Sequence, residues 1–252
     1  MSRIKKGLNM DLLIKRRSFH KFNEVLPIND DELSMIRSFC DNVTPLFKDI
    51  KFHIELVDET KINDAKGASH GLIFYSEKKD NYLLNIGYIG EQIDLFLQQN
   101  NFGTLWYGFG KDKSNTVTDL DFVIILLFSK VDPSSFRKDI SEFKRKELSS
   151  VIKSDNLSFL NQSLLAPSAC NTSPYFIKGD ENKFEIYKTK NGLALLALSK
   201  RLTTYFNFID VGIFLYYVDY IVSNKQLKYK KEFHPYDISE TKDQLIVTYR
   251  KQ

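Results

Sequence analysis

The feature that most constrains this chain is a weak internal repeat, because two copies of one sequence pattern predict two copies of one arrangement of helices and strands. Three pairs of segments are similar and occur in the same order: 71–76 (GLIFYS) with 192–197 (GLALLA), 89–97 (IGEQIDLFL) with 211–219 (VGIFLYYVD), and 121–128 (DFVIILLF) with 243–250 (DQLIVTYR). The offset is 121 residues for the first pair and 122 for the other two. Chance similarity among apolar runs could explain any one pair, but the nearly constant offset favours a duplication.

A looser pair extends the repeat towards the N-terminus, with Asn42, Pro45 and Phe47 matching Asn171, Pro174 and Phe176 at an offset of 129. The repeat predicts two halves, residues 1–135 and 136–252, that form one intimate structural unit. Each half is expected to hold a hydrophobic run, a long helix and a closing strand.

Periodicity and capping signals predict a mixed chain of helices and strands. Acidic residues that suit a helix N-terminus open the segment from Asp30, and apolar residues alternate with polar ones from Phe52 to Leu56. Further elements are expected at 87–99 (helix), 122–129 (strand buried on both faces), 192–220 (one or two helices) and 245–249 (strand).

Composition and charge narrow the class of protein. A chain of 252 residues with 42% hydrophobic and 27% charged residues is typical of a soluble globular protein, and a net charge of +4 does not favour nucleic-acid binding. Two distant cysteines and four scattered histidines suggest neither disulfides nor a metal site. The N-terminus lacks the apolar stretch of a signal peptide, and Asp210 and Asp219 interrupt the apolar run 206–222, so we expect a cytoplasmic protein with a buried helix there.

Two segments suggest binding of a phosphate and of a flat ring. In residues 14–22 (IKRRSFHKF), Arg16, Arg17 and Ser18 supply donors that suit a phosphate dianion, although a solvated basic start is the alternative. In residues 164–177 (LLAPSACNTSPYFI), prolines stiffen a loop whose small and polar residues would admit a flat ligand, although a helix-ending turn is the alternative. The candidate contacts in this loop are Pro167, Ser168, Ala169 and Asn171.

Two further segments could contribute to the same site. Residues 87–110 are expected to form a helix followed by a Gly-aromatic loop, in which Trp106 and Tyr107 could flank an aromatic ligand. A core helix with its C-terminal cap is the alternative. Residues 143–148 (FKRKEL) place Lys144 and Arg145 at the junction of the halves, where a solvated charged face is the alternative.

Together these segments resemble the nitroreductase family. RRSFHKF resembles the family's RRSxRxF/Y start, LAPSACNTSPYF its APSAxNxQPW segment, and GYIGEQIDLFLQQNNFGTLWYG its long central helix with a GTCW-G-type loop. FKRKEL resembles the basic run near the family's C-terminus. In ordinary members the APSAxN segment follows RRSxR closely, whereas about 150 residues separate the two here. This order resembles that of nitroreductases in which one chain imitates the homodimer.

The resemblance implies an α+β, nitroreductase-like fold of two tandem pseudo-symmetric halves, with one FMN held by both. It assigns the phosphate to Arg16, Arg17 and Ser18, with His20 in place of the usual basic residue. It assigns contacts with one side of the flavin ring to Pro167, Ser168, Ala169 and Asn171. It assigns contacts with the other side of the ring to Gly103, Thr104, Trp106, Tyr107 and Gly108. Extra phosphate contacts are assigned to Lys144 and Arg145. The first half has Ser38-Phe39-Cys40 in place of Pro-Ser-Ala, so one FMN per chain is expected.

The resemblance also implies the chemistry. NADH or NADPH would reduce the flavin, and a nitroaromatic, quinone or similar flat electrophile would then take the electrons in a ping-pong reaction. The catalytic work would fall to the flavin, with no metal, nucleic acid or membrane as partner, and a fused pair can act as a monomer. The alternative is an FMN-binding protein without turnover, a flavin sensor or store, because Ser173, Tyr175 and His20 depart from the family pattern. The preferred nicotinamide and the natural electron acceptor are not readable from the sequence.

Overall fold

The protein is described here from a computed structural model that covers residues 10–114, 116, 118–189, 199–240 and 242–252. The chain forms two compact units. The first unit is Ile14–Glu142, and the second unit is Phe143–Gln252 together with the described residues up to Leu13. The polypeptide passes from one unit to the other at the start of the basic FKRKEL segment.

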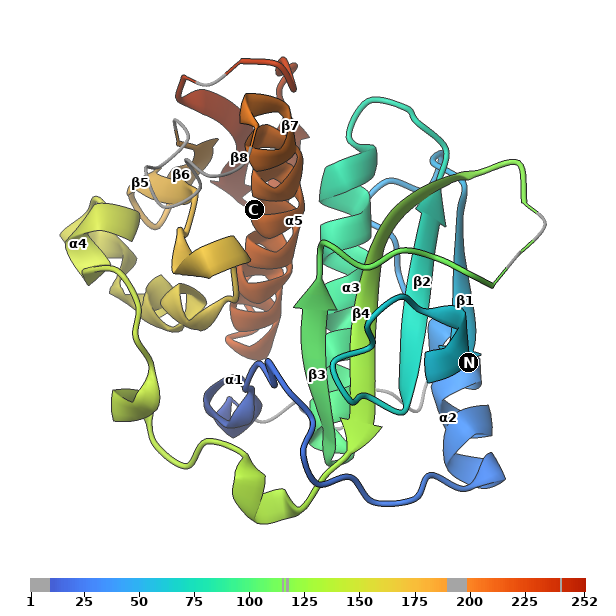
Figure 1. The fold of residues 1–252 in the computed structure, drawn as a ribbon. Helices are drawn as coiled ribbons and strands as arrows, with labels where there is room; N and C mark the ends of the chain where they lie inside the picture. The colour runs from blue at the N-terminus through green and yellow to red at the C-terminus, as the bar shows by residue number, and fades with distance from the viewer. Residues whose placement is uncertain (1–9, 115, 117, 190–198, 241) are drawn as a thin grey trace. The chain divides into compact units, whose positions relative to one another are not determined.

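The first unit is built on a four-stranded antiparallel sheet in the order β1-β2-β4-β3 (Figure 1). Its strands are β1 (Phe52–Asp58), β2 (His70–Ser76), β3 (Phe102–Tyr107) and β4 (Asp121–Lys130). The long helix α3 (Tyr82–Gln99) connects β2 to β3 and packs against the sheet. The helix α2 (Asp30–Cys40) precedes the sheet and begins at a capping box formed by Asn29 and Glu32, as its acidic first turn predicts.

Strand β4 has apolar residues on both faces because both faces are covered. Ile125 and Leu127 belong to a cluster with Phe22, Val57 and Phe136 on one face. On the other face, Phe128 packs edge-on against Phe102, the first residue of β3, with ring centroids 5.9 Å apart. The predicted buried strand at 122–129 is therefore confirmed.

The second unit repeats this architecture with a sheet in the order β5-β6-β8-β7. Its strands are β5 (Tyr175–Gly179), β6 (Lys183–Lys188), β7 (Tyr229–Phe233) and β8 (Gln244–Lys251), and its long helix is α5 (Lys200–Asn224). The ring of Tyr175 on β5 stacks on that of Phe214 on α5 at 3.8 Å. By length and composition α5 could cross a membrane, but 83% of its most apolar stretch is buried in the protein, as the sequence predicts for a core helix.

The two sheets match in topology and in detail. In each unit a hairpin is followed by the long helix and a second hairpin, and the second and fourth strands form the central pair. The central pairing is irregular at equivalent places, between Phe74 and Tyr75 in β2 and between Ile186 and Tyr187 in β6. Such irregularities are retained as features of a fold rather than defects, so their repetition supports the predicted duplication.

The structure corrects two of the sequence pairs. The counterpart of β2 is β6, whereas the segment 192–197 that was matched with it lies outside the described residues. Phe176 lies within β5, but Phe47 precedes β1, so the looser pairing at an offset of 129 is wrong. The first hairpin is longer in the first unit, where Phe52 pairs with Ser76, than in the second, where Tyr175 pairs with Lys188. The longer connection from β6 to α5 compensates for this, so β2 and β6 are the strands that the offset of the other elements does not align.

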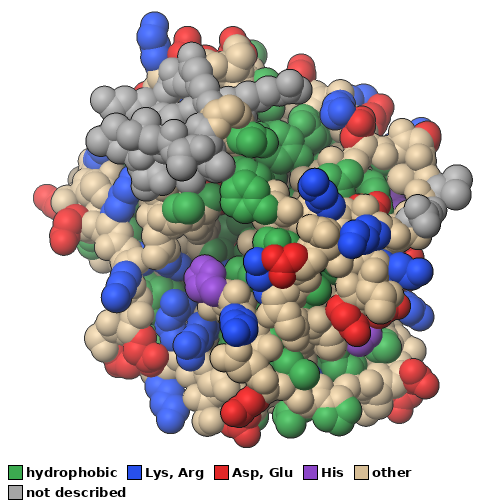
Figure 2. All heavy atoms as spheres, viewed as in Figure 1, with side chains coloured by type: hydrophobic (Ala, Val, Ile, Leu, Met, Phe, Trp, Pro, Cys, Tyr) green, Lys and Arg blue, Asp and Glu red, His purple; other side chains and the backbone are tan. Residues whose placement is uncertain are grey.

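Short helical turns connect these elements. They are α1 (Asp11–Lys15), η1 (Glu59–Lys61), η2 (Pro133–Ser135), η3 (Ile140–Glu142), α4 (Leu148–Val151), η4 (Asp155–Leu165) and η5 (Ala169–Asn171). Acidic and basic side chains are scattered together over the face drawn in Figure 2, in agreement with the nearly balanced composition.

Candidate functional site

The basic N-terminal segment of the first unit is fastened along the edge of the sheet. The backbone N–H of Phe19 donates to the carbonyl of Thr104 at 2.9 Å, and Ser18 forms a parallel bridge with Thr104 on the edge strand β3. The backbone N–H of Arg17 donates to the side-chain oxygen of Gln98 on α3 at 2.7 Å. We call residues 16–19 the N-terminal arm. These bonds fix its backbone on both β3 and α3.

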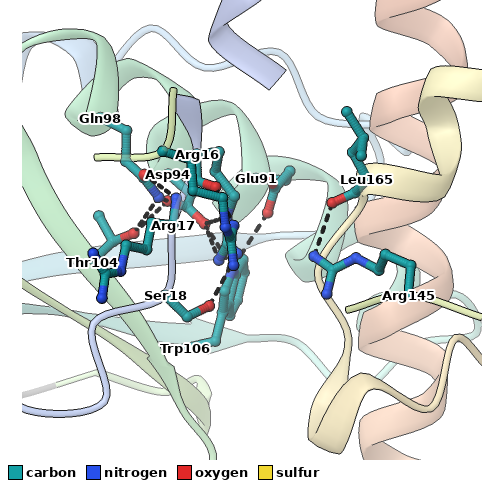
Figure 3. Close-up of polar contacts among 11 residues, drawn as sticks. Arg16, Arg17, Ser18, Glu91, Asp94, Gln98, Thr104, Trp106, Arg145 and Leu165 are labelled. Carbon is teal, nitrogen blue, oxygen red and sulfur yellow. Dashed lines mark hydrogen bonds and ion pairs between the residues drawn. The ribbon is translucent and has the colours of Figure 1, made fainter. Parts of the chain in front are cut away.

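Arg16 of this arm points into the protein core rather than towards solvent (Figure 3). Its guanidinium donates to Asp94 Oδ2 through Nε at 3.1 Å and through Nη2 at 2.9 Å, and its Nη1 donates to Ser18 Oγ at 2.9 Å. The side chains of Arg16 and Asp94 are 1% and 0% exposed, so the ion pair is fully buried. Arg16 was predicted to contact a phosphate, but its donors are committed to holding the arm on α3.

Asp94 is the centre of a buried polar cluster that also includes two strand residues. Its Oδ1 accepts from Thr104 Oγ1 at 2.5 Å and from Gln98 Nε2 at 2.7 Å, and its Oδ2 accepts from Trp106 Nε1 at 3.1 Å. Trp106 Nε1 also lies 3.3 Å from a carboxyl oxygen of Glu91. Several donors thus compensate the cost of burying this carboxylate. The sequence carried a signal for the cluster, since Glu91, Asp94 and Gln98 interrupt an apolar helix on one face.

The remaining residues of the arm differ in exposure, and the partly buried Phe19 packs against the hydrophobic cluster of Ile125 and Leu127. Arg17 is exposed, its guanidinium lies 5.5 Å from the centre of the Phe19 ring, and its Nη1 donates to the carbonyl of Ser135 at 2.7 Å. Ser18 is half-buried, and its Oγ accepts from Arg16, an arrangement in which the hydroxyl can still act as a donor. His20 is exposed just beyond the arm. The arm therefore presents a guanidinium and a hydroxyl donor from a fixed backbone.

The aromatic segment after α3 is a strand and not the predicted loop. Gly103, Thr104 and Trp106 all lie in β3, and Gly108 follows in a turn. A side chain at Gly103 would approach the ring of Phe19 to 2.8 Å, so glycine is required there by close packing rather than by a turn. Trp106 packs on α3 and stacks with Phe74 at 6.2 Å. Most of the Trp106 side chain therefore packs inside the first unit. Tyr107 is the last residue of the strand, and its hydroxyl lies 3.5 Å from Asp64 Oδ2.

The Pro-Ser-Ala segment of the second unit forms a tight loop with unusual backbone geometry. We call residues 167–173 the PSA loop. Cys170, Asn171 and Ser173 have φ angles of 51°, 56° and 37°, in the left-handed region that residues other than glycine seldom adopt. The loop is closed by bonds from the N–H of Ser173 to Ser168 Oγ at 2.9 Å and from Thr172 Oγ1 to the carbonyl of Ala169 at 2.9 Å. Strained backbone of this kind is frequent at ligand-binding sites.

Side chains from elsewhere in the second unit hold the PSA loop. Arg145 donates through Nη1 to Asn171 Oδ1 and through Nη2 to the carbonyl of Leu165 at 3.0 Å, the second contact being drawn in Figure 3. Lys146 donates to the carbonyl of Ser173 at 3.2 Å, and the exposed Lys144 precedes Arg145 in the chain. The basic segment therefore contacts the loop, which its position in the sequence does not reveal.

Asp210 contacts the PSA loop from α5. The backbone N–H of Ala169 donates to its two carboxyl oxygens at 3.0 and 3.1 Å, and the residue is 4% exposed. Burial raises the pKa of Asp210 to about 8, and the bond from Ala169 opposes this shift. The sequence places Asp210 only as a charge that interrupts an apolar helix.

The sequence of the PSA loop is not repeated in the first unit. Ser38, Phe39 and Cys40, which replace Pro-Ser-Ala in the sequence match, are the last residues of helix α2. The strand pairing instead aligns Phe52 of β1 with Tyr175 of β5, because their partners Ser76 and Lys188 are equivalent. Residues 44–48 (TPLFK) are then the counterpart of residues 167–171, and they contain neither the serine nor the asparagine.

The candidate residues form two groups, one in each unit. Arg16, Ser18 and Trp106 meet around Asp94 in the first unit, and Arg145 meets Asn171 in the second. No group of three or more His, Cys, Asp or Glu side chains that could hold a metal ion occurs in the described parts of the chain.

Comparison with solved structures shows a fold similar over the whole length. A protein from Thermotoga maritima described as a "putative nitroreductase" has a TM-score of 0.62 at 18% identity, with 100% of this chain and 97% of that chain covered. This similarity confirms the predicted nitroreductase-like α+β fold.

Shorter nitroreductases are also similar to part of the chain. A nitroreductase family protein from Clostridium difficile 630 has a TM-score of 0.40 at 12% identity, covering 55% of this chain and 98% of that one. An FMN-dependent nitroreductase from Clostridium difficile R20291 has a TM-score of 0.42 at 14% identity, covering 53% and 93%. A search of curated proteins gave no match.

A comparison with models of protein families gave a match over most of the sequence. The model described as "Putative TM nitroreductase" matches residues 10–221, which include the arm, α3, the PSA loop and most of α5. On this evidence the chain belongs to that nitroreductase family.

Proposed function

We propose that this chain binds FMN and acts as an NAD(P)H-dependent oxidoreductase on a nitroaromatic, quinone or similar flat electrophile. Membership of a nitroreductase family supports the general class of reaction, an oxidoreduction. The observation that carries the FMN assignment is the PSA loop, in which three residues other than glycine hold left-handed backbone conformations at the position of the family's flavin-binding motif. A cytoplasmic monomer that reacts with a small-molecule acceptor is part of the same proposal.

The chemistry of the residues fits the two ends of FMN. On the arm, Arg17 and Ser18 offer a charged fork and a hydroxyl donor for a phosphate, with Arg16 positioning the Ser18 oxygen. On the PSA loop, small side chains at Ala169 and Cys170 leave the backbone accessible to a flat ring.

The division of labour follows from the same residues. When bound, FMN would supply a ring that accepts a hydride from NADH or NADPH and passes electrons to the acceptor. The chain's own residues bind and orient: the arm holds the phosphate, and the PSA loop presents backbone groups and Asn171 to the ring. Lys144 and Arg145 add positive charge beside the loop.

The experiment is to record the visible spectrum of the purified protein and to titrate it with FMN by following flavin fluorescence. Arg17→Ala and Ser18→Ala should each weaken FMN binding by about 10-fold, since each removes one charge-assisted hydrogen bond. Lys21→Ala is the matched control, because Lys21 is an exposed cation just outside the arm and should leave the affinity unchanged. A colourless protein that takes up no added FMN would refute the proposal.

Stopped-flow mixing with NADH and NADPH separates an enzyme from a flavin store. Rapid bleaching of the flavin absorbance by either nucleotide supports the enzyme and identifies its reductant. A chain that binds FMN but is bleached by neither nucleotide would be a binding protein without turnover.

A further inference from the structure

We infer that Asp210 is a positioning residue that holds the PSA loop in its ligand-binding conformation through the backbone N–H of Ala169. Its place in the FMN site rests on the proposed function, whereas its hold on the loop does not. Asp210 lies on α5, about 40 residues from the loop in sequence and outside the motifs that identify the family resemblance.

The contact is placed where the loop most needs support. Ala169 comes directly before Cys170 and Asn171, whose φ angles of 51° and 56° are unfavourable for residues with a side chain. Strained conformations of this kind persist only when the surrounding structure fixes them. Arg145 contacts the loop at Asn171 and Lys146 contacts it at Ser173, so Asp210 supplies the attachment at the other end.

The burial of Asp210 also requires an explanation. A carboxyl group that is 4% exposed is costly to desolvate, and an apolar residue would fit the surrounding helix sequence at less cost. What the carboxyl group gives in return is an acceptor for Ala169, with two oxygens at 3.0 and 3.1 Å from one nitrogen. A role in fixing the loop therefore accounts for the retained polar group.

Variants on both sides of this hydrogen bond test the inference. Asp210→Leu removes the acceptor and keeps similar volume, whereas Asp210→Asn keeps an acceptor oxygen in a side chain that cannot ionise. Ala169→Pro removes the donor, and the extended backbone of Ser168 (φ −152°, ψ 156°) is compatible with a following proline. Asp219→Asn is the control, because Asp219 is the other acid in the middle of α5 but bonds to Lys231 and Tyr249.

The first measurement is amide hydrogen exchange in the protein without FMN, read from peptides that cover residues 166–174. Exchange in this segment should be about 10-fold faster in Asp210→Leu than in wild type, because a lost hydrogen bond lowers the local opening free energy. Asp210→Asn and Asp219→Asn should remain close to wild type. Unchanged exchange in Asp210→Leu would overturn the inference, whatever the protein binds.

The second measurement is the FMN dissociation constant. Asp210→Leu and Ala169→Pro should each bind FMN about 10-fold more weakly, and the double variant should be no worse than either, because both remove the same bond. Rescue of affinity by Asp210→Asn distinguishes loop positioning from general damage to the fold. Equal FMN affinity in all variants would overturn the role of Asp210 in FMN binding. A wild-type protein that binds no FMN would refute the proposed function. The exchange experiment would still decide whether Asp210 holds the loop.

If Asp210→Leu fails to fold, Ala169→Pro and Asp210→Asn decide the question. The inference then requires faster exchange in Ala169→Pro and wild-type exchange in Asp210→Asn. The reverse pattern would contradict it.

Discussion

At the scale of single residues, Asp94 is a buried acid whose hydrogen bonds hold several segments of the first unit together. Its carboxylate is fully buried and accepts from Arg16, Gln98, Thr104 and Trp106. These donors come from the arm, from α3 and from β3, so one side chain connects three segments of the unit. A buried charge with several partners is costly to leave incomplete.

We therefore expect Asp94→Ala to destabilise the protein by about 3–5 kcal/mol, since it leaves the Arg16 guanidinium buried without its partner. Chemical denaturation monitored by circular dichroism measures the decrease in the free energy of unfolding. Asp121→Ala is the control, because Asp121 pairs with Lys78 at a surface where both side chains are about half exposed, and such pairs contribute about 0.5 kcal/mol. Similar losses in the two variants would mean that the buried cluster is not a structural centre.

Asp210 predicts a dependence of stability on pH. Burial raises its pKa from 3.8 to about 8, so between these pH values the folded chain holds a proton that the unfolded chain has released. Stability should then fall as pH rises through this window, by up to about 1.4 kcal/mol per pH unit from this group. Asp210→Asn removes the effect. The unfolding free energy of the variant minus that of wild type should therefore increase from pH 5 to pH 8. A constant difference would show that Asp210 does not titrate in this range.

At the scale of elements, the packing of α3 on β3 depends on a glycine. A Cβ atom at Gly90 would lie 2.3 Å from Cη2 of Trp106, and the ring is fixed by its N–H bonds to Asp94 and Glu91. Gly90→Ala should therefore destabilise the protein by about 1–3 kcal/mol, despite the better helix propensity of alanine. Trp106 is the chain's single tryptophan, so its fluorescence reports the displacement directly. In a Trp106→Leu background the same substitution should cost less, and an equal cost would place the strain elsewhere.

The elements that could be predicted are those whose own residues determine them. The acidic opening of α2, the buried run of β4 and the long apolar helices are local signals that the structure confirms. Strand β3 was taken for a loop because Gly103 is a turn signal in sequence, whereas here it makes room for Phe19 from the distant arm. Helix α3 begins at Tyr82, five residues before the predicted start at 87, and Asn81 at its N-cap makes no side-chain capping bond.

The site was predictable as motifs but not as a set of contacts. Arg16 and Arg17 are adjacent and identical in type, and only the position of Asp94, 78 residues away, decides which of them is buried. The contact between Asp210 and Ala169 could likewise not be predicted from the sequence, because it depends on how α5 packs on the loop. Local sequence identifies residue types suited to a ligand, and long-range packing decides which of them keep free donors.

At the scale of the whole molecule, we predict one FMN per chain of 29.4 kDa. The second unit has the PSA loop, whereas the aligned residues 44–48 of the first unit read TPLFK and the residues matched in sequence end helix α2. Equilibrium dialysis with FMN measures the stoichiometry, and light scattering coupled to gel filtration should give a monomer. Two flavins per chain, or a flavin bound only by a dimer, would contradict this prediction.

The repeated sheet topology, with its irregularity at the same place in β2 and β6, has a consequence for how such a protein can change. In an assembly of identical subunits, every mutation is inherited by all copies, so their pockets must improve or decay together. When both copies lie in one reading frame, selection can preserve the loop in one unit while the equivalent residues 44–48 of the other unit lose its serine and asparagine. The tandem arrangement thus allows the two halves to evolve different sites, which the identical subunits of a homodimer cannot do.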